Sequence, residues 1–292
     1  AEESGANYLF EASVGGGIPI IRPLCQCLAA NYIEGIAGIL NGTTNFILTM
    51  MIEKGMSFDE ALKIAQEKGY AEKDPTADVE GYDACRKVCI LASLAFGKHV
   101  YPNQVETEGI TNITLEDVSY IENAGGVIKL LGQIKYINDN EIAAFVSPAV
   151  VYNGSQLASV KDVFNAILVR GDAVGDVCFY GPGAGKLPTA SAVVADIIDC
   201  AKHSERKKIF GWGAGAEDYV VDYKERIEMP FYVRAKATPA EINAKFSDVK
   251  FLSRKGQPSD EVAFITDIMT ENKLNKKLDG INVINTIKVT NY

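Results

Sequence analysis

Asp83 and Lys87 are the first candidates for chemistry in this sequence. They stand four residues apart on a predicted helix over residues 83–96, so a carboxylate lies one turn before an ammonium. At about 100° per residue both fall on the arc of Ala84, Ile90, Leu91 and Leu94, opposite Arg86, Cys89 and Ser93. Desolvation among apolar side chains tends to lower the pKa of a lysine, so such a lysine can exchange protons near neutral pH. A structural buried ion pair is the open alternative.

Five acids stand before or at the start of this helix, at Glu72, Asp74, Asp78, Glu80 and Asp83. A helix N-terminus attracts carboxylates, so one interpretation is that they only stabilise the helix. The other is a cluster that binds a cationic group, such as the amine of a substrate.

Three glycine clusters could bring backbone N–H groups close to a phosphate. Residues 15–17 follow a predicted strand but lack the G-x-G-x-x-G spacing, and residues 181–187 are one residue too short for a P-loop and end in Leu187. The second cluster leads into a predicted helix, so its N–H groups could approach a cofactor. The third, at residues 211–215, is expected to be only a flexible part of a linker.

The composition restricts the class of protein. The chain has 292 residues, a formal net charge of −9, 47% hydrophobic and 23% charged residues, which is typical of a soluble globular protein. An acidic chain without a basic run is a poor nucleic-acid binder, and no apolar stretch reaches the roughly 18 residues that span a membrane. Six cysteines and two histidines match no zinc template. We therefore expect a cytoplasmic protein with reduced thiols that binds neither nucleic acid nor membrane.

Several elements must position these residues. A strand is predicted at Tyr8–Val14, and it needs sheet partners elsewhere. Ser57 and Glu60 form a capping-box pattern that should open a helix. The other expected elements are a helix to about residue 30, a strand at 32–40, a helix from Thr43, strands at Glu141–Val151 and Asp162–Val169, and a helix at Leu187–Ala201.

After a polar, Gly-rich linker, the pattern of the C-terminal part predicts a strand, a helix, two strands, a helix and a strand. This βαββαβ order predicts a small ferredoxin-like domain. The expected elements are Phe231–Ala237, Pro239–Lys245, Val249–Arg254, Glu261–Ile268, Glu271–Leu278 and Val283–Thr290.

Four blocks of the sequence together resemble homoserine dehydrogenase. They are residues 10–21, 38–47, 69–87 and 181–193, and they occur in the family's order and spacing. The resemblance implies an α+β or α/β fold, in which a mixed-sheet catalytic domain is followed by a small ACT-like domain. It also implies a reversible oxidation of L-homoserine to L-aspartate 4-semialdehyde with NAD or NADP, in threonine, methionine and isoleucine biosynthesis.

The resemblance assigns roles to individual residues. Lys87 would transfer the proton, and Asp83 would position it or touch the substrate. The implied substrate-binding residues are Glu72, Asp78 and Asp83, and those near the nicotinamide nucleotide are Gly69, Gly183 and Gly185. A monovalent cation, sodium, would be held by the Glu11 carboxylate and the backbone carbonyls of Val14, Gly16 and Ile18.

The resemblance also implies an organisation into parts. Residues 1–16 would be a remnant of a nucleotide-binding domain, 17–186 the catalytic and dimerisation domain, and 187–203 a helix returning to the first domain. Residues 204–225 would be a linker and 226–292 the ACT-like domain. We expect a homodimer or higher homo-oligomer whose sheets join within Glu141–Val169, because strand edges must be paired or covered.

Two segments depart from the family's pattern. Ser155–Ala158 replaces a His-Pro-Leu-Ala run, and Ala237–Ala240 replaces the usual Asp-x-Pro-Gly loop of an ACT domain. Because most of the cofactor domain lies outside this sequence, we expect the chain alone to be inactive. The alternative is a stand-alone amino-acid-binding regulatory module.

Overall fold

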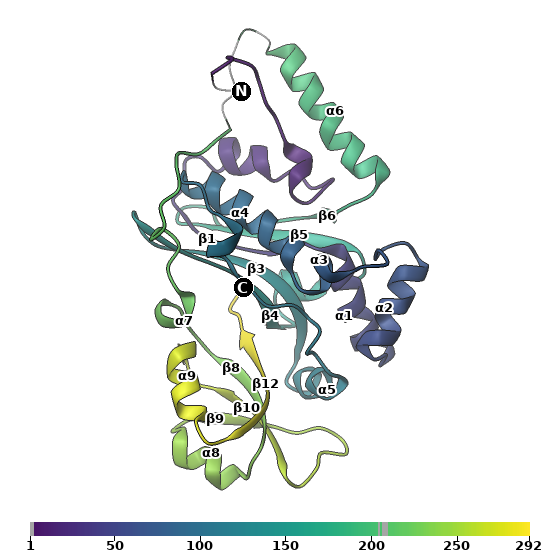
Figure 1. Ribbon diagram of the computed structural model, residues 1–292, viewed down its shortest axis with the longest axis vertical. Coiled ribbons are helices and arrows are strands. Elements are labelled where there is room, and N and C mark those ends of the chain that lie inside the picture. The colour runs from purple at the N-terminus through teal and green to yellow at the C-terminus, as the bar shows by residue number, and fades with distance from the viewer. Residues whose placement is uncertain (1–2, 204, 206–209) are drawn as a thin grey trace.

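The computed structural model describes residues 3–203, 205 and 210–292. Figure 1 shows an elongated molecule with the N-terminal segment and α6 at one end, a layered α/β body in the middle and a smaller α/β unit at the other end. One mixed sheet runs through the last two parts in the order β6-β5-β1-β3-β4-β12-β8-β10-β9, with β2 beside β4. Among the described residues, no helix is long and apolar enough to cross a membrane.

The larger part of the sheet is built from antiparallel strands, with the two-residue strand β2 added in parallel to β4. Its strands are β1 (Ile33–Ile39), β2 (Glu106–Thr107), β3 (Gly126–Asn138), β4 (Glu141–Tyr152), β5 (Phe164–Gly171) and β6 (Gly175–Pro182). Side chains alternate between the two faces of a strand, so Ile128 and Val150, which are register partners on β3 and β4, point into the main core together. This core is closed by helices on one face of the sheet.

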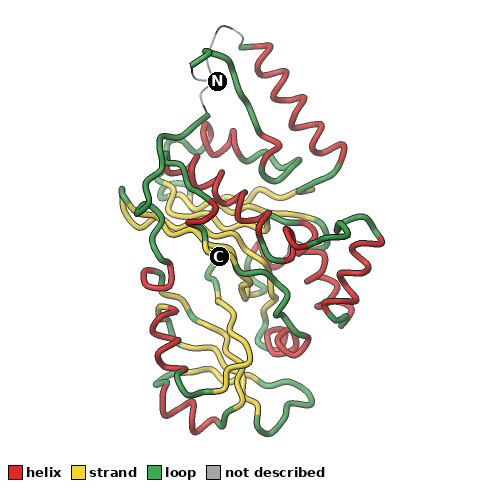
Figure 2. The backbone as a smooth tube through the Cα atoms, viewed as in Figure 1, coloured by secondary structure: helices red, strands yellow, loops and turns green. Residues whose placement is uncertain are grey.

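The helices on that face carry the candidate residues. They are α1 (Gly42–Lys54), α2 (Phe58–Glu67), α3 (Thr76–Val79), α4 (Tyr82–Phe96) and α5 (Leu115–Asn123), and α4 and α5 pack on β3 (Figure 2). The predicted capping box is confirmed, because Ser57 and Glu60 bond each other's backbone N–H at the start of α2. Gly97, with φ 78°, ends α4 in the left-handed region.

The predicted βαββαβ order of the C-terminal unit is confirmed. Its elements are β8 (Phe231–Lys236), α8 (Pro239–Lys245), β9 (Val249–Leu252), β10 (Glu261–Thr266), α9 (Glu271–Leu278) and β12 (Asn282–Val289). Short additions precede or interrupt them, at α7 (Tyr223–Arg226), β7 (Glu228–Met229) and β11 (Met269–Thr270). The unit is not a separate sheet, because β12 pairs in parallel with β4 through Lys288–Ala149 and Val289–Val150.

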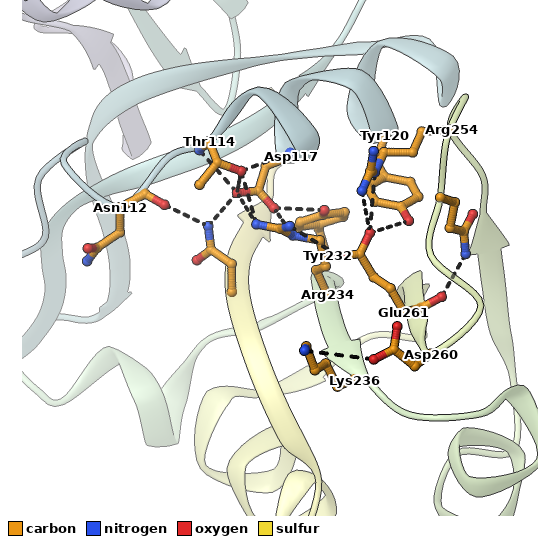
Figure 3. Close-up of polar contacts among 12 residues, drawn as sticks. Asn112, Thr114, Asp117, Tyr120, Tyr232, Arg234, Lys236, Arg254, Asp260 and Glu261 are labelled. Carbon is orange, nitrogen blue, oxygen red and sulfur yellow. Dashed lines mark hydrogen bonds and ion pairs between the residues drawn. The ribbon is translucent and has the colours of Figure 1, made fainter. Parts of the chain in front are cut away.

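A buried polar network also joins this unit to α5 (Figure 3). The Asp117 carboxylate, 0% exposed, accepts hydrogen bonds from the Tyr232 hydroxyl at 2.9 Å and from Arg234 Nε at 2.8 Å. Glu261 accepts bonds from Tyr120 on α5 at 2.9 Å and from Arg234 Nη1 at 3.4 Å. Two carboxylates and the Arg234 guanidinium therefore share one buried cluster between β8, β10 and α5.

The N-terminal predictions are partly wrong. Residues 8–10 form no strand, and Glu11–Ser13 is a single 3₁₀ turn. The expected helix to residue 30 is short and ends in the π-helical segment Pro23–Cys27. The Glu11 carboxylate accepts the backbone N–H groups of Ile20, Ile21 and Arg22, and so closes a compact loop where a strand was expected. The helix predicted at 187–201 is confirmed as α6 (Lys186–Lys202).

The structure also places part of the predicted linker and the strands within Glu141–Val169. Residues 204 and 206–209 lie outside the described residues, but Gly213 forms a bridge with Lys98, and a Cβ at Gly215 would meet His99 O at 2.6 Å. The cluster 211–215 is thus docked on the body. The strand edges within Glu141–Val169, which we expected to be paired or covered at a dimer contact, are paired inside the chain, because β4 lies between β3 and β12 and β5 lies between β1 and β6.

Candidate active site

Lys87 lies in the middle of the candidate site, on α4. Its Nζ donates a hydrogen bond to Asp83 Oδ2 at 2.7 Å and another to the carbonyl oxygen of Leu40, at the end of β1, at 2.8 Å. The side chains of Lys87 and Asp83 are 19% and 31% exposed, so the pair is half-buried. A lysine ammonium has three N–H donors, and these two bonds engage two of them.

Asn41 is a site residue that the sequence reasoning missed. Its Nδ2 donates to Asp78 Oδ1 at 2.7 Å and to Asp83 Oδ2 at 2.9 Å. Its Oδ1 accepts the backbone N–H of Thr44 at 2.9 Å and thereby caps α1. Because the cap fixes which end of the amide faces the helix, the NH₂ group is aimed at the two carboxylates. An Asn directly before a predicted helix is a capping signal, and this is the only local sign of its role.

The predicted division of α4 into an apolar and a polar arc is wrong in part. Cys89 and Ser93, placed on the polar arc, are 6% and 1% exposed, while Ile90 is only half-buried. Ser93 Oγ is inside because it donates to Cys89 O at 2.7 Å and accepts Val100 N–H at 2.9 Å. Asp83 and Lys87 are themselves only partly buried, whereas Ala84 and Leu91 beside them are 2% and 0% exposed, so the two arcs do not differ simply in burial.

The acidic stretch does not cap α4 with side chains. The N-cap of α4 is Gly81, at φ 81°, which forms no side-chain capping bond. Asp74 instead accepts the Thr76 hydroxyl at 2.6 Å and its N–H at 3.2 Å, at the start of α3. Asp78 joins Asp83 through Asn41, whereas the Glu72 side chain is exposed. Of the predicted substrate-binding acids, two are therefore brought together with Lys87.

The predicted cofactor glycines lie in two places. Gly69, with φ 74°, follows α2 and leads into the acidic stretch, and Gly185, with φ 120°, precedes α6. Gly183 is packed tightly, because a Cβ there would meet Asn165 Nδ2 at 2.1 Å. A Cβ at Gly16 would in turn meet Gly183 O at 2.3 Å, so the two glycine clusters touch each other.

Glu11 does not fit the implied sodium site through its side chain. Glu11 is 4% exposed, and its carboxylate already accepts the N–H groups of Ile20 and Ile21 at 2.7 Å each and of Arg22 at 2.9 Å. These donors occupy most of the oxygen lone pairs that a cation would use. The turn at 14–18 is closed by a hydrogen bond from Ile18 N–H to the carbonyl oxygen of Gly15 at 2.8 Å. This bond does not use the carbonyl oxygens of Val14, Gly16 and Ile18.

Asp196 and Arg22 anchor α6 to this loop, and the sequence did not predict their role. Asp196 on α6 accepts the Glu11 N–H at 2.9 Å and forms an ion pair with Arg22. An acid on the helix and a basic residue far earlier in the chain give no spacing signal, so only the fold brings them together.

Comparison with known proteins identifies the family. The family model of homoserine dehydrogenase matches residues 19–198. The homoserine dehydrogenase of Synechocystis is 50% identical over 202 residues, which are 68% of this chain and 47% of that protein. The crystal structure of a homoserine dehydrogenase from Thiobacillus denitrificans superposes with a TM-score of 0.87 at 37% identity, covering 99% of this chain and 72% of that one.

A hyperthermophilic archaeal homoserine dehydrogenase mutant in complex with NADPH is also similar, with a TM-score of 0.58 at 32% identity, covering 69% of this chain and 58% of that one. The chain spans about half the length of the curated relatives that it matches, at 47% of each of the first two. The matched region contains Asn41, Asp78, Asp83 and Lys87. The chain therefore belongs to the homoserine dehydrogenase family.

Proposed function

We propose that this chain supplies the substrate-binding and proton-transfer part of a homoserine dehydrogenase, which oxidises L-homoserine reversibly to L-aspartate 4-semialdehyde. The observation that carries the proposal is the bonded set of Lys87, Asp83, Asn41 and Asp78. A stand-alone binding module would not require a lysine held in this way, so the set favours the enzyme over that alternative.

Lys87 is the proposed proton-transfer residue. Its Nζ is fixed by Asp83 and by the Leu40 carbonyl, which leaves its third N–H for a substrate oxygen. In the direction of reduction, Nζ donates a proton to the aldehyde oxygen as the carbonyl carbon receives a hydride. In the direction of oxidation, neutral Nζ accepts the hydroxyl proton. NAD or NADP supplies the hydride chemistry when it is bound.

The acids are proposed to hold the amino group of homoserine. Asp78 and Asp83 lie on one side of Asn41, and Glu72 adds an exposed carboxylate at the approach to α3. Carboxylates bind an ammonium by charge-assisted hydrogen bonds, and this fixes the distance from the amine to the reacting carbon.

The cofactor is proposed to pass along Gly69, Gly183 and Gly185, and a Cβ added at Gly69 would meet nothing within 4 Å among the described residues. The archaeal relative in complex with NADPH supports this cofactor class. One face of α6 exposes Leu187, Val193, Val194, Ile197 and Ile198. We propose that a nucleotide-binding domain covers this apolar face, together with the segment 1–16, so that 187–203 belongs to that domain.

The remaining assignments are also proposals. Residues 17–186 form the catalytic part and 226–292 an ACT-like regulatory domain, supported by the βαββαβ order. The carbonyls of Val14, Gly16 and Ile18 are the groups that would hold a sodium ion, which would stiffen the turn, while Glu11 only shapes the loop. We also propose that the enzyme works as a homodimer in the cytoplasm.

The test is a fusion in which the nucleotide-binding part of the Synechocystis relative precedes this chain. We expect steady reduction of NADP with L-homoserine by the fusion, and none by the chain alone. We also expect the chain alone to bind NADPH no tighter than about millimolar, since a few backbone contacts do not offset the entropy of fixing a dinucleotide. A soluble, folded fusion without turnover would contradict the proposal.

A further inference from the structure

A cavity outside the candidate active site lies between β3 and the segment that follows β12. Its volume is about 250 Å³. Gln133 and Lys135 of β3 line one side, and Met229, Pro230, Ile268 and Val289 supply an apolar wall from the C-terminal unit. The cavity is slightly smaller than the roughly 300 Å³ at which drug-sized sites begin, so its ligand must be a small molecule.

Two hydrogen-bond donors of β3 reach this cavity without an acceptor. Gln133 is 1% exposed, and in the described part of the chain its Nε2 has no hydrogen-bond partner. Lys135 is half-buried and, among the described residues, forms no ion pair; its Nζ lies 5.6 Å from the centroid of the Tyr292 ring. Since the two residues are two apart on a strand, both side chains project from the same face.

Unpaired donors in a buried place cost folding free energy, which an acceptor from a ligand would recover. Burial and the nearby Arg170 lower the pKa of Lys135, and no acid raises it. An amide donor beside an ammonium suits a carboxylate, whose two oxygens can accept one bond from each. The apolar wall opposite suits an aliphatic body of a few carbon atoms.

We propose that this cavity binds a small aliphatic carboxylate, with its carboxylate at Gln133 and Lys135 and its carbon chain against Met229, Ile268 and Val289. The inference does not depend on the proposed dehydrogenase activity. Such a ligand contacts β3 of the larger part and the C-terminal unit at once, so it stabilises the junction between them.

A single bridging water is the competing explanation for Gln133. Ser147 Oγ, on the same face of the neighbouring β4, is also buried without a partner in the described chain, and one water could serve both groups. That arrangement leaves no preference for a carboxylate and no role for the apolar wall. The experiment below therefore separates the two explanations.

The test is a calorimetric titration of the chain with 3-methylbutanoate. Two matched probes accompany it: acetate keeps the carboxylate and lacks the carbon chain, and 3-methylbutan-1-ol keeps the chain and lacks the charge. We expect saturable binding of 3-methylbutanoate and at least about tenfold weaker binding of each matched probe. Absence of saturable binding, or equal affinity for the three probes, would overturn the proposal.

Variants locate the site. Gln133→Leu and Lys135→Met each remove one donor and keep most of the side-chain volume, and we expect each to weaken binding by about tenfold. Lys276→Met, on the exposed side of α9, removes the same charge elsewhere and should leave the affinity unchanged.

A third variant is expected to bind more tightly, and an increase in affinity cannot result from misfolding. Glu228, exposed at the rim of the cavity, repels a bound carboxylate, so Glu228→Gln should strengthen binding by about twofold. Unchanged affinity in both donor variants would place any binding elsewhere and overturn the proposal.

Discussion

Asn41 Nδ2 lies 2.9 Å from Asp83 Oδ2, the same oxygen that accepts the hydrogen bond from the Lys87 ammonium. The Asn41 side chain cannot turn away without giving up the cap of α1, because its Oδ1 accepts the Thr44 N–H. The start of α1 thus holds a carboxylate of α3 and one of α4 beside the lysine. We infer that this amide positions the charged groups without touching the substrate.

Substitution of Asn41 tests this positioning. Asn41→Ser and Asn41→Asp both keep an N-cap side chain, so the helix should remain stable, but both remove the NH₂ donors. A hydrogen bond to a charged group is worth about 1.5–3 kcal/mol, so we expect kcat/KM of the fusion enzyme to fall by about 10- to 100-fold in Asn41→Ser. Asn41→Asp should lose more, because it adds a third carboxylate, and its pH–rate profile should move to higher pH.

The control for the cap is Ser57→Asn, at the start of α2 and away from the site. All three variants should have melting temperatures close to that of the unsubstituted chain. If Asn41→Ser keeps full activity, or if both Asn41 variants lose activity only in step with unfolding, Asn41 has no positioning role.

Arg234 should dominate the stability of the junction with the C-terminal unit. Arg234→Met leaves the buried Asp117 carboxylate without its guanidinium, and breaking such a pair typically costs about 3–5 kcal/mol. Arg226→Met is the matched control, since its ion pair with Glu141 is exposed and worth at most about 1 kcal/mol. Urea unfolding measures both, and equal losses would refute a special role for the buried cluster.

Lys129 should give the chain a stability that rises with pH. It is 2% exposed, and burial, with a smaller contribution from Lys161, lowers its pKa to about 8. An unfolded lysine titrates near 10.4, so between about pH 8 and 10 the unfolded chain binds more protons and the folded state gains stability as pH rises. Urea unfolding at pH 7.5 and 9.5 should show this gain, and Lys129→Met should lack it. The same gain in both proteins would assign it to another group.

The oligomeric state is open to a direct measurement. Because β4 and β5 are paired on both edges within the chain, a dimer cannot form by adding strands there, and the outer strands of the sheet are β6 and β9. We still expect a dimer, and light scattering at micromolar concentration should give twice the mass of one chain. A monomer under these conditions would refute the homodimer.

Local patterns predicted much of the fold. The capping box at Ser57, the helix of Lys87 and the βαββαβ order all follow from periodicity and caps close in sequence. The N-terminal strand failed because its outcome depends on Glu11 binding N–H groups about ten residues later. Apolar alternation carries no information about such a contact.

The candidate site was predictable in its charges but not in its organisation. The spacing of Asp83 and Lys87 fixes their i,i+4 contact on any helix. Asn41 lies 42 residues before Asp83, so its contact is set by how α1 packs beside α3, which in turn contacts α4. The burial of Cys89 and Ser93 likewise depends on elements that cover α4 from outside its own sequence.

The central claim is that Lys87 transfers the proton, and turnover of the fusion enzyme carrying Lys87→Ala tests it most directly. Loss of a general acid–base group typically costs about 10²- to 10⁴-fold, and we expect kcat to fall within this range while the chain stays folded. Lys98→Ala, outside the site, should leave kcat unchanged. A Lys87→Ala enzyme that retains more than about a tenth of the unsubstituted kcat at saturating homoserine would contradict the account, because that loss is smaller than a general acid–base role requires.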